Sequence, residues 1–251
     1  MNSSMNLGGA HMIAHRGYSA MAPENTLPAF KLAGENGFWG AECDTSPTAD
    51  GVWVVMHDDT VDRTTSGEGP VNSFTFDEIR ALTIDGGNHP EQFPEANVPL
   101  LSEYLDVCKA YGLHCVIEIK DCTPVDLLPD LAALLGAREE KERFTIISFG
   151  REHCLRMKAL MPETPVLFLT GDFNTDDFGE NIQFCLDNGL DGLDFNCDWG
   201  DEAHVKEAIA AGLQTMIWTA DDLDIIKKYY GWGVRDFTSN AIPPKAIEGL
   251  F

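Results

Sequence analysis

The residues that could carry out a reaction gather in a few short segments in the first half of this 251-residue chain. One of them, residues 13–17, is an apolar run that ends in His15 and Arg16, followed by a glycine. A packed strand gains nothing from these two residues, whereas a site that holds an anion and moves a proton needs both types. The other segments contribute a similar set of ionisable residues: Glu42, Asp44, His57, Glu118 and Lys120.

The spacing of the acidic residues predicts a cation site. Glu42 and Asp44 are two residues apart, as are Glu118 and Lys120, so each pair leaves the same face of an extended strand. Three carboxylates that converge repel one another strongly unless a cation neutralises them. Oxygen ligands of this kind suit Ca²⁺ or Mg²⁺ better than zinc. We therefore expect one divalent metal ion, Ca²⁺ or Mg²⁺, at these carboxylates.

The remaining charged residues indicate what the cation would act on. Arg16 and Lys120 supply fixed positive charge for an anion, Arg16 through a planar fork and Lys120 as a point charge. His15 and His57 can form a general acid–base pair. A metal ion, a basic clamp and two proton carriers together predict cleavage of a phosphodiester.

The elements that must position these residues follow an alternating pattern. Short β-rich runs are separated in most places by helix-like segments, which predicts right-handed crossovers and a parallel sheet. Eight such runs favour an α/β (β/α)₈ TIM barrel, whose catalytic residues come from the C-terminal ends of several strands. The runs lie at residues 12–15, 39–44 with 52–57 behind it, 115–119, 144–149, 166–170, 192–195, 215–219 and 236–239.

Residues 58–99 interrupt this alternation between the second and third barrel strands. They are rich in Gly, Pro, Asn and acidic residues, and only residues 74–82 look helical, with Thr75 and Glu78 matching a capping box. A connection this long is usually a functional excursion. We expect an insertion over the barrel mouth inside a single catalytic domain, residues 12–251, after a leader at 1–11 that is either disordered or not native.

Composition narrows the possible partners. The 17 basic and 41 acidic residues give a formal net charge of −24, which argues against nucleic acid or an anionic membrane as a partner. Seven irregularly spaced cysteines match neither a disulfide framework nor a zinc site. They indicate reduced thiols in a cytoplasmic protein. We expect a small-molecule substrate and no stable membrane association, while the oligomeric state stays open.

Two segments carry a family resemblance: "HRGYSAMAPENTLPAF" with "GAECDTSPTADGVWVVMHDDTVDRTT", and later "VIEIK". Their order of His-Arg, Glu-x-Asp and His resembles the glycerophosphodiester phosphodiesterase family of TIM-barrel enzymes. The close match covers about residues 13–65 and returns at 116–120, and the later half matches mainly in layout.

The resemblance implies roles for individual positions. It implies metal ligands at Glu42, Asp44 and Glu118, catalytic histidines at His15 and His57, and phosphate-binding charges at Arg16 and Lys120. Trp218 is expected to form part of the pocket wall and to contact the substrate. The resemblance also makes residues 23–26 the turn after the first strand, with Asn25 or Thr26 as the cap of the first helix. Asp58, Asp59 and Asp62 are expected to serve the turn in which they lie, through local hydrogen bonds.

The expected reaction is hydrolysis of a glycerophosphodiester to glycerol 3-phosphate and an alcohol. Whether water attacks directly or a cyclic phosphate forms first stays open, as do the acid and base roles of the two histidines. The released alcohol is equally open. Two alternatives remain: a phospholipase D or C type enzyme acting on lysophospholipids, and a non-catalytic metal- or phosphate-binding module. The second predicts the loss of a histidine or a ligand, and none is missing.

Overall fold

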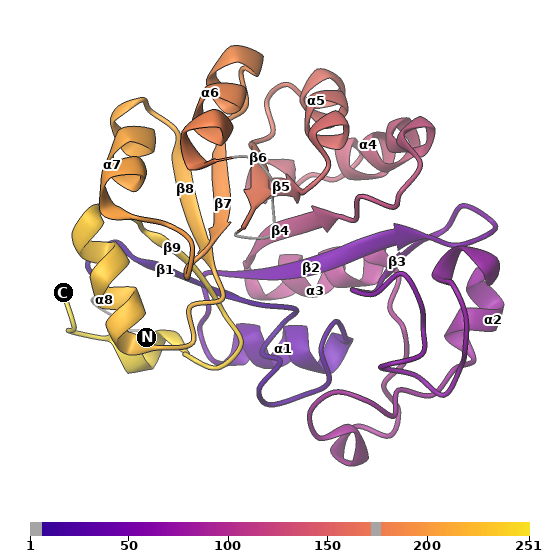
Figure 1. Ribbon diagram of the computed structural model, residues 1–251. Coiled ribbons are helices and arrows are strands. Elements are labelled where there is room, and N and C mark those ends of the chain that lie inside the picture. Colours follow the sequence, from indigo (N-terminus) through magenta and orange to yellow (C-terminus); the bar gives the residue numbers. More distant parts are fainter. Residues whose placement is uncertain (1–6, 172–176) are drawn as a thin grey trace.

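Eight parallel strands close into a barrel in the computed structural model, which describes residues 7–171 and 177–251. Pairing of β1 with both β2 and β9 joins the two edges of the sheet. The predicted TIM barrel is therefore confirmed, with helices around the outside (Figure 1). The barrel strands are β1 His11–Ala14, β2 Gly40–Pro47, β4 His114–Ile119, β5 Phe144–Ser148, β6 Val166–Thr170, β7 Gly192–Asn196, β8 Gln214–Trp218 and β9 Asp236–Ser239.

The helices follow from apolar residues spaced at three and four positions. In α3, for example, Leu101, Tyr104, Leu105 and Cys108 are buried against the barrel, and Gly112 ends the helix in a left-handed conformation. The main helices are α1 Leu27–Glu35, α2 Phe76–Arg80, α3 Leu101–Tyr111, α4 Leu128–Gly136, α5 Arg151–Leu160, α6 Phe178–Asn188, α7 Glu202–Ala210 and α8 Leu223–Trp232.

An apolar plug fills the barrel beneath its mouth. It consists of six buried side chains on the inward-facing positions of five strands: Ile13, Val116, Ile147, Leu167, Leu169 and Met216. A larger apolar cluster lies between the barrel and the helices. Because the interior is packed, the polar residues at the strand ends gather above the plug and not within a pore.

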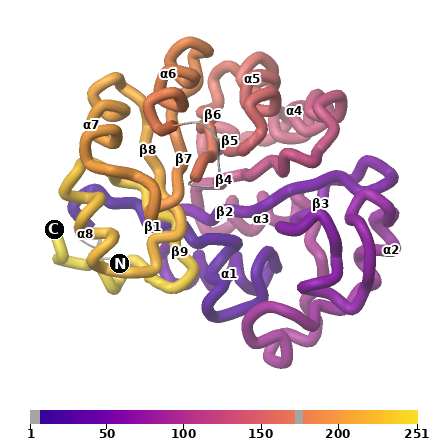
Figure 2. The backbone as a smooth tube through the Cα atoms, in the orientation of Figure 1, coloured from indigo at the N-terminus to yellow at the C-terminus, as the bar shows by residue number. Residues whose placement is uncertain are grey.

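The insertion at residues 58–99 forms a lobe beside β2 and the short strand β3 Trp53–Val55 (Figure 2). β3 pairs antiparallel with β2, and Val54, Met56, Val61 and Ile79 belong to an apolar cluster at the base of the lobe. The lobe contains α2 and the 3-10 turns η1 Val71–Ser73 and η2 Pro90–Gln92. The predicted capping box of Thr75 and Glu78 is confirmed.

Other sequence features find simple explanations. All seven cysteines lie within the described residues and are free thiols, as predicted. Residues 1–6 of the expected leader lie outside the described part of the chain. Among the helices of the described residues, none combines the length and the apolar character needed to cross a membrane.

Candidate active site

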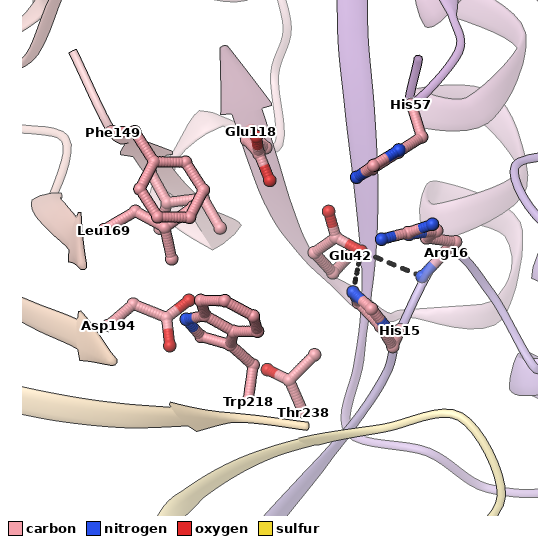
Figure 3. Close-up of a pocket in the computed structure, with 11 residues that line it drawn as sticks. His15, Arg16, Glu42, His57, Glu118, Phe149, Leu169, Asp194, Trp218 and Thr238 are labelled. Carbon is pink, nitrogen blue, oxygen red and sulfur yellow. Dashed lines mark hydrogen bonds and ion pairs between the residues drawn. The ribbon is translucent and has the colours of Figure 1, made fainter. Parts of the chain in front are cut away.

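A cavity of about 250 Å³ opens above the apolar plug, at the C-terminal ends of the barrel strands (Figure 3). One side carries charged residues from β1, β2 and β4, and the other carries apolar residues from β5, β6 and β8. Ligand sites in TIM barrels lie at this end of the strands. The residues around the cavity are His15, Arg16, Glu42, His57, Glu118, Ile147, Phe149, Leu169, Asp194, Trp218 and Thr238.

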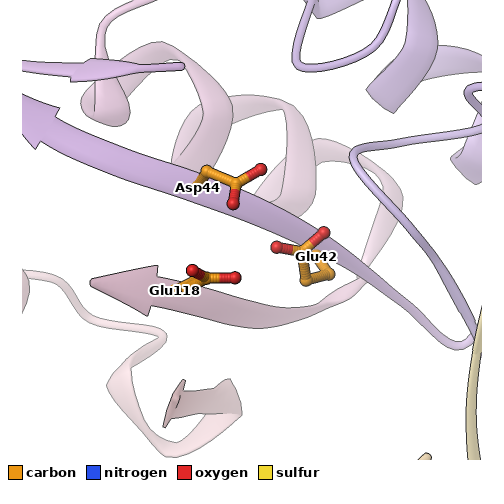
Figure 4. Close-up of side chains that lie close together, drawn as sticks. All are labelled: Glu42, Asp44 and Glu118. Carbon is orange, nitrogen blue, oxygen red and sulfur yellow. The ribbon is translucent and has the colours of Figure 1, made fainter. Parts of the chain in front are cut away.

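The three predicted carboxylates converge on the charged side. Glu42 and Asp44 leave the same face of β2, and Asp44 is in register with Glu118 on β4. One oxygen from each carboxylate lies within 4.8 Å of the others, and all three residues are buried (Figure 4). The prediction from strand alternation that these groups meet is confirmed.

Two cationic side chains hold this cluster together. The Lys120 Nζ lies 2.6 Å from Glu118 Oε1 and 3.4 Å from Asp44 Oδ1. The Arg16 Nε lies 3.6 Å from Asp44 Oδ2, and the Arg16 backbone N–H donates to Glu42 Oε2 at 2.8 Å. Arg16 adopts a left-handed backbone conformation with φ of 55°, which is rare for residues other than glycine and often marks a functional site.

The glycine after Arg16 allows the first helix to approach this strand end. A Cβ atom on Gly17 would lie 2.7 Å from the backbone carbonyl carbon of Ala29 in α1, and the φ of Gly17 is 77°. Only glycine fits both the conformation and the close contact. The glycine of the His-Arg-Gly segment is thereby explained by packing, and the histidine and arginine by the site.

Of the two residues expected at the cap of α1, Thr26 occupies the position, and Asn25 belongs to the cluster. Its Nδ2 donates to Asp44 Oδ2 at 2.7 Å, and its Oδ1 accepts from the Asp44 backbone N–H at 3.3 Å. Thr26 occupies the N-cap position, but its hydroxyl donates to the Pro23 carbonyl instead of accepting from the helix. The turn therefore orients a candidate metal ligand.

The protonation of the carboxylates reflects their crowding. Burial, together with Asp44 and Glu118, raises the pKa of Glu42 well above its usual value. Burial and Asp44 also raise the pKa of Glu118 to about 7. Burial opposes ionisation of Asp44 too, but the charges of Lys120 and other neighbours outweigh it and hold its pKa well below the usual value.

The donor set fits a divalent cation. Glu42 Oε1 is buried without a hydrogen-bond partner among the described residues. An orphaned, buried carboxylate oxygen that faces two further carboxylates is stabilised by a positive ion. The three oxygens match the preference of Ca²⁺ and Mg²⁺ for hard ligands.

The partner of His15 is a neutral amide. Its Nδ1 lies 2.8 Å from Asn240 Oδ1, while the backbone N–H and Nδ2 of Asn240 both donate to Asp221 at 2.7 Å. Because Asn240 Oδ1 can only accept, the proton of a neutral His15 sits on Nδ1, and Nε2 is left as an acceptor. Burial and the charge of Arg16 lower the pKa of His15 to about 4.

The partner of His57 is a carboxylate. His57 Nδ1 lies 2.6 Å from Asp58 Oδ1. Arg63 of the insertion donates to both oxygens of Asp58, at 2.7 and 3.0 Å, and to both oxygens of Glu24, at 2.9 and 2.8 Å. Glu24 in turn accepts from Arg16 at 2.8 Å. One insertion side chain therefore links the histidine to the arginine.

The opposite wall of the cavity is apolar except at two points. Phe149 and Trp218 contact each other edge to face, with ring centroids 5.9 Å apart. Between the apolar side chains, Asp194 Oδ1 and Thr238 Oγ1 are buried without a hydrogen-bond partner in the part of the chain described. Sequence reasoning missed both residues, because a single Asp or Thr in an apolar strand carries no motif.

Asp194 leads to a prediction about stability. Burial, with Glu118 and Asp236 nearby, raises the pKa of its carboxyl well above the usual value. The native chain therefore holds this proton to a higher pH than the unfolded chain, which ionises the group near pH 4, so its contribution to stability is present below that pH and is lost as the pH rises. Asp194→Asn is expected to stabilise the metal-free protein at pH 8 by about 1–3 kcal/mol and to change little at pH 4.

Thermal unfolding across this pH range in the presence of a chelator measures the effect. At about 2–4 °C per kcal/mol for a chain of this size, the expected rise in Tm is several degrees. The exposed Asp126→Asn serves as the control. Equal Tm values for Asp194→Asn and the unaltered chain at pH 8 would contradict a raised pKa of Asp194.

All eight site residues expected from the sequence lie at this end of the barrel. His15, Arg16, Glu42, His57, Glu118 and Trp218 line the cavity, and Asp44 and Lys120 complete the cluster behind it. Sequence reasoning missed the residues that orient them: Glu24, Asn25, Asp58, Arg63 and Asn240. Glu24 and Asn25 lie in the segment HRGYSAMAPENTLPAF that carries the family resemblance, and this position could have indicated a role at the site.

Comparison with known proteins agrees with this geometry. A phosphodiesterase from Oleispira antarctica, solved in complex with the product sn-glycerol-3-phosphate, superposes with a TM-score of 0.83 at 27% identity, over 94% of each chain. A glycerophosphodiester phosphodiesterase from Agrobacterium tumefaciens superposes with a TM-score of 0.78 at 26% identity, over 95% of this chain and 99% of that one.

Curated relatives match shorter stretches. A glycerophosphodiester phosphodiesterase from Caldanaerobacter subterraneus is 40% identical over 159 residues, which is 62% of this chain and 64% of that protein. Glycerophosphodiester phosphodiesterase 1 of Rattus norvegicus is 44% identical over 110 residues, 43% of this chain and 33% of its own length. The match thus spans a third of the rat relative. The model of the glycerophosphoryl diester phosphodiesterase family matches residues 15–242, and the chain belongs to this family.

Proposed function

We propose that the chain hydrolyses glycerophosphodiesters to sn-glycerol 3-phosphate and an alcohol, with the help of one divalent cation. The observation that carries this proposal is that three buried carboxylates, the cationic side chains of Arg16 and Lys120, and two histidines lie together at one cavity. The relative from Oleispira antarctica, which holds sn-glycerol-3-phosphate, supports the substrate class.

Glu42, Asp44 and Glu118 would hold the cation, and Ca²⁺ and Mg²⁺ are both suited to these ligands. When bound there, the ion would offset the negative charge that builds up on the phosphate oxygens. Asn25 keeps Asp44 oriented through two hydrogen bonds. Such supporting hydrogen bonds fix the direction of a ligand's lone pairs.

Arg16 and Lys120 hold the remaining phosphate oxygens and contribute by positioning and by charge. Both are already placed by ion pairs, Arg16 with Glu24 and Lys120 with Glu118. Trp218 and Phe149 form the opposite wall, where they exclude water and contact the organic part of the substrate.

The partners of the two histidines separate their roles. His15 donates a hydrogen bond from Nδ1 to the amide oxygen of Asn240, which leaves Nε2 unprotonated. His15 therefore serves as the base that takes the proton of the attacking oxygen. His57 Nδ1 instead lies 2.6 Å from a carboxylate oxygen of Asp58, an acceptor that can keep a proton on Nδ1 while Nε2 donates one to the substrate. His57 therefore serves as the acid that protonates the leaving alcohol.

The experiment that tests the function is release of sn-glycerol 3-phosphate from glycerophosphocholine and glycerophosphoethanolamine. Ca²⁺, Mg²⁺ and a chelator are compared, beside a His15→Ala control. We expect release with at least one metal and none with the chelator or the control. If a folded sample releases no sn-glycerol 3-phosphate with either metal, the proposal is wrong.

Arg63 provides a prediction about positioning. Replacing Arg63 with alanine removes its hydrogen bonds to both Asp58 and Glu24, which hold His57 and Arg16 in position. We therefore expect kcat on glycerophosphocholine to fall by roughly 10- to 100-fold and the pH profile of kcat to change. Arg80 is a matched control, because it also lies in the insertion and donates to both oxygens of a glutamate, Glu103, away from the cavity. A similar loss in Arg80→Ala would show that any disturbance of the lobe has this effect.

A further inference from the structure

A second cavity of about 160 Å³ lies between the insertion and the barrel. Its barrel side is formed by Ser46 at the end of β2 and by Cys122 and Thr123 after β4. Its outer side is formed by Asp59 and Asn72 of the insertion, among others. None of these residues has a role in the proposed hydrolysis.

The sequence order on two neighbouring strands places this cavity beside the carboxylate cluster. Along β2, Glu42 faces the first cavity and Ser46 faces the second. Along β4 and its continuation, Glu118 faces the first cavity and Cys122 faces the second. On each strand the residue midway between them, Asp44 or Lys120, lines neither cavity, and these two residues form an ion pair with 3.4 Å between Lys120 Nζ and Asp44 Oδ1.

The second cavity contains polar groups that could form hydrogen bonds with a ligand. Ser46 and Thr123 are only 4% and 3% exposed, and their hydroxyls have no hydrogen-bond partner among the described residues. Buried hydroxyls without a partner are costly, and a ligand that hydrogen-bonds to them removes the cost. Asp59 adds an exposed acceptor that takes a bond from the Cys122 thiol at 3.0 Å.

A phosphodiester carries one organic group on each side of its phosphorus, and along both strands Lys120 or its partner Asp44 stands between a residue that lines the first cavity and one that lines the second. We propose that the second cavity binds the leaving alcohol, and that it selects alcohols with hydroxyl groups of their own. This inference rests on the proposed function. It also adds a substrate class, because small polyol head groups fit the cavity better than alkyl groups of equal size.

The position of His57 decides which organic group lies where. An acid that protonates the leaving oxygen must lie beside it. His57 faces the first cavity, but the second residue after it, Asp59, already lines the second one. His15, the proposed base, follows the end of β1 on the same charged side of the first cavity and does not adjoin any residue that lines the second one (Figure 3). The leaving alcohol therefore points toward the insertion, and the glycerol phosphate part remains in the first cavity.

Blocking the second cavity tests this arrangement. Asn72→Trp places a large side chain at an exposed residue of its rim, and Ser73→Trp places the same bulk at the exposed neighbour, which does not line the cavity. We expect Asn72→Trp to raise KM for glycerophosphoglycerol at least tenfold and to leave inhibition by sn-glycerol 3-phosphate unchanged. Ser73→Trp should change neither. Weaker inhibition in Asn72→Trp, or an unchanged KM, overturns the proposal.

Removing the hydroxyls tests the selectivity. Thr123→Val keeps the shape of the side chain, and Ser46→Ala removes one oxygen. Glycerophosphoglycerol is compared with glycerophosphopropanol, in which the leaving alcohol has the same carbon chain but no further hydroxyls. Each variant is expected to lower kcat/KM for the first substrate by roughly 2- to 10-fold, which corresponds to one hydrogen bond, and to leave the second nearly unchanged.

The outcomes separate this inference from the proposed function. If the unaltered chain releases no sn-glycerol 3-phosphate from any diester, the function is wrong and the inference falls with it. If the unaltered chain is active and both variants lose equally on the two substrates, the hydroxyls are structural and only the inference is wrong. Circular dichroism and Tm confirm that each variant is folded before its kinetics are compared.

Discussion

Replacing His57 with alanine is expected to lower kcat on glycerophosphocholine by about 10²- to 10⁴-fold, the usual contribution of general acid–base catalysis. The loss should be far smaller on the p-nitrophenyl ester of glycerol 3-phosphate. p-Nitrophenolate is a weak base that leaves without being protonated, so a missing acid matters little there. The measurement is steady-state kinetics on both substrates with saturating metal.

His15→Ala provides the matched comparison, because the base is needed whatever the leaving group is. We expect it to lose activity on both substrates to a similar degree. The reverse pattern, in which only the His15 variant recovers on the p-nitrophenyl ester, would exchange the two roles. Equal losses on both substrates in both variants would mean that neither histidine acts as the acid.

The distinction between the histidines depends on contacts that the sequence does not reveal. His15 meets Asn240, which lies 225 positions away, whereas His57 meets its immediate neighbour Asp58. Asp58 was expected to serve only the local turn, and its role became apparent only with Arg63 in place. Local patterns identify the reactive residues, but the partner that sets a protonation state is fixed by tertiary packing.

The fold and the cluster were more accessible to prediction. Alternating apolar runs indicated the barrel, and the two-residue spacing of Glu42 and Asp44 indicated a shared face. The sequence left Asn25 and Thr26 open as the cap of α1, and the structure places Thr26 there while Asn25 holds Asp44. Asn side chains satisfy either role equally well, so only the fold decides between them.

The acidity of the chain does not conflict with binding an anionic substrate. Its formal net charge is −24, but the cavity brings Arg16 and Lys120 against the three carboxylates. A cation at the carboxylates would leave these two positive side chains free to attract phosphate. Local charge at the site, and not the total, decides which ligand enters, because exposed charges beyond about 8–10 Å are screened by salt.

Glu42→Gln is expected to make the metal-free protein more stable and at the same time to abolish its response to metal. Without a cation, Glu42 is a buried carboxyl beside two others, and its pKa lies well above the usual value. Its contribution to stability is therefore lost as the pH rises above about 4, and an amide avoids that loss. We expect a gain of about 1–3 kcal/mol at pH 8 in the presence of a chelator.

Addition of Ca²⁺ or Mg²⁺ should reverse the order of the two proteins. A cation present at 100 times its dissociation constant stabilises the unaltered chain by about 2.7 kcal/mol, whereas Glu42→Gln has lost one of three ligands. Asp194→Asn is the control, because it also replaces a buried carboxyl at the cavity with an amide but lies outside the cluster. Its Tm should still rise with metal. If Glu42→Gln responds to metal as strongly as Asp194→Asn does, the cation does not bind at Glu42, and the reaction must be organised around a different set of ligands.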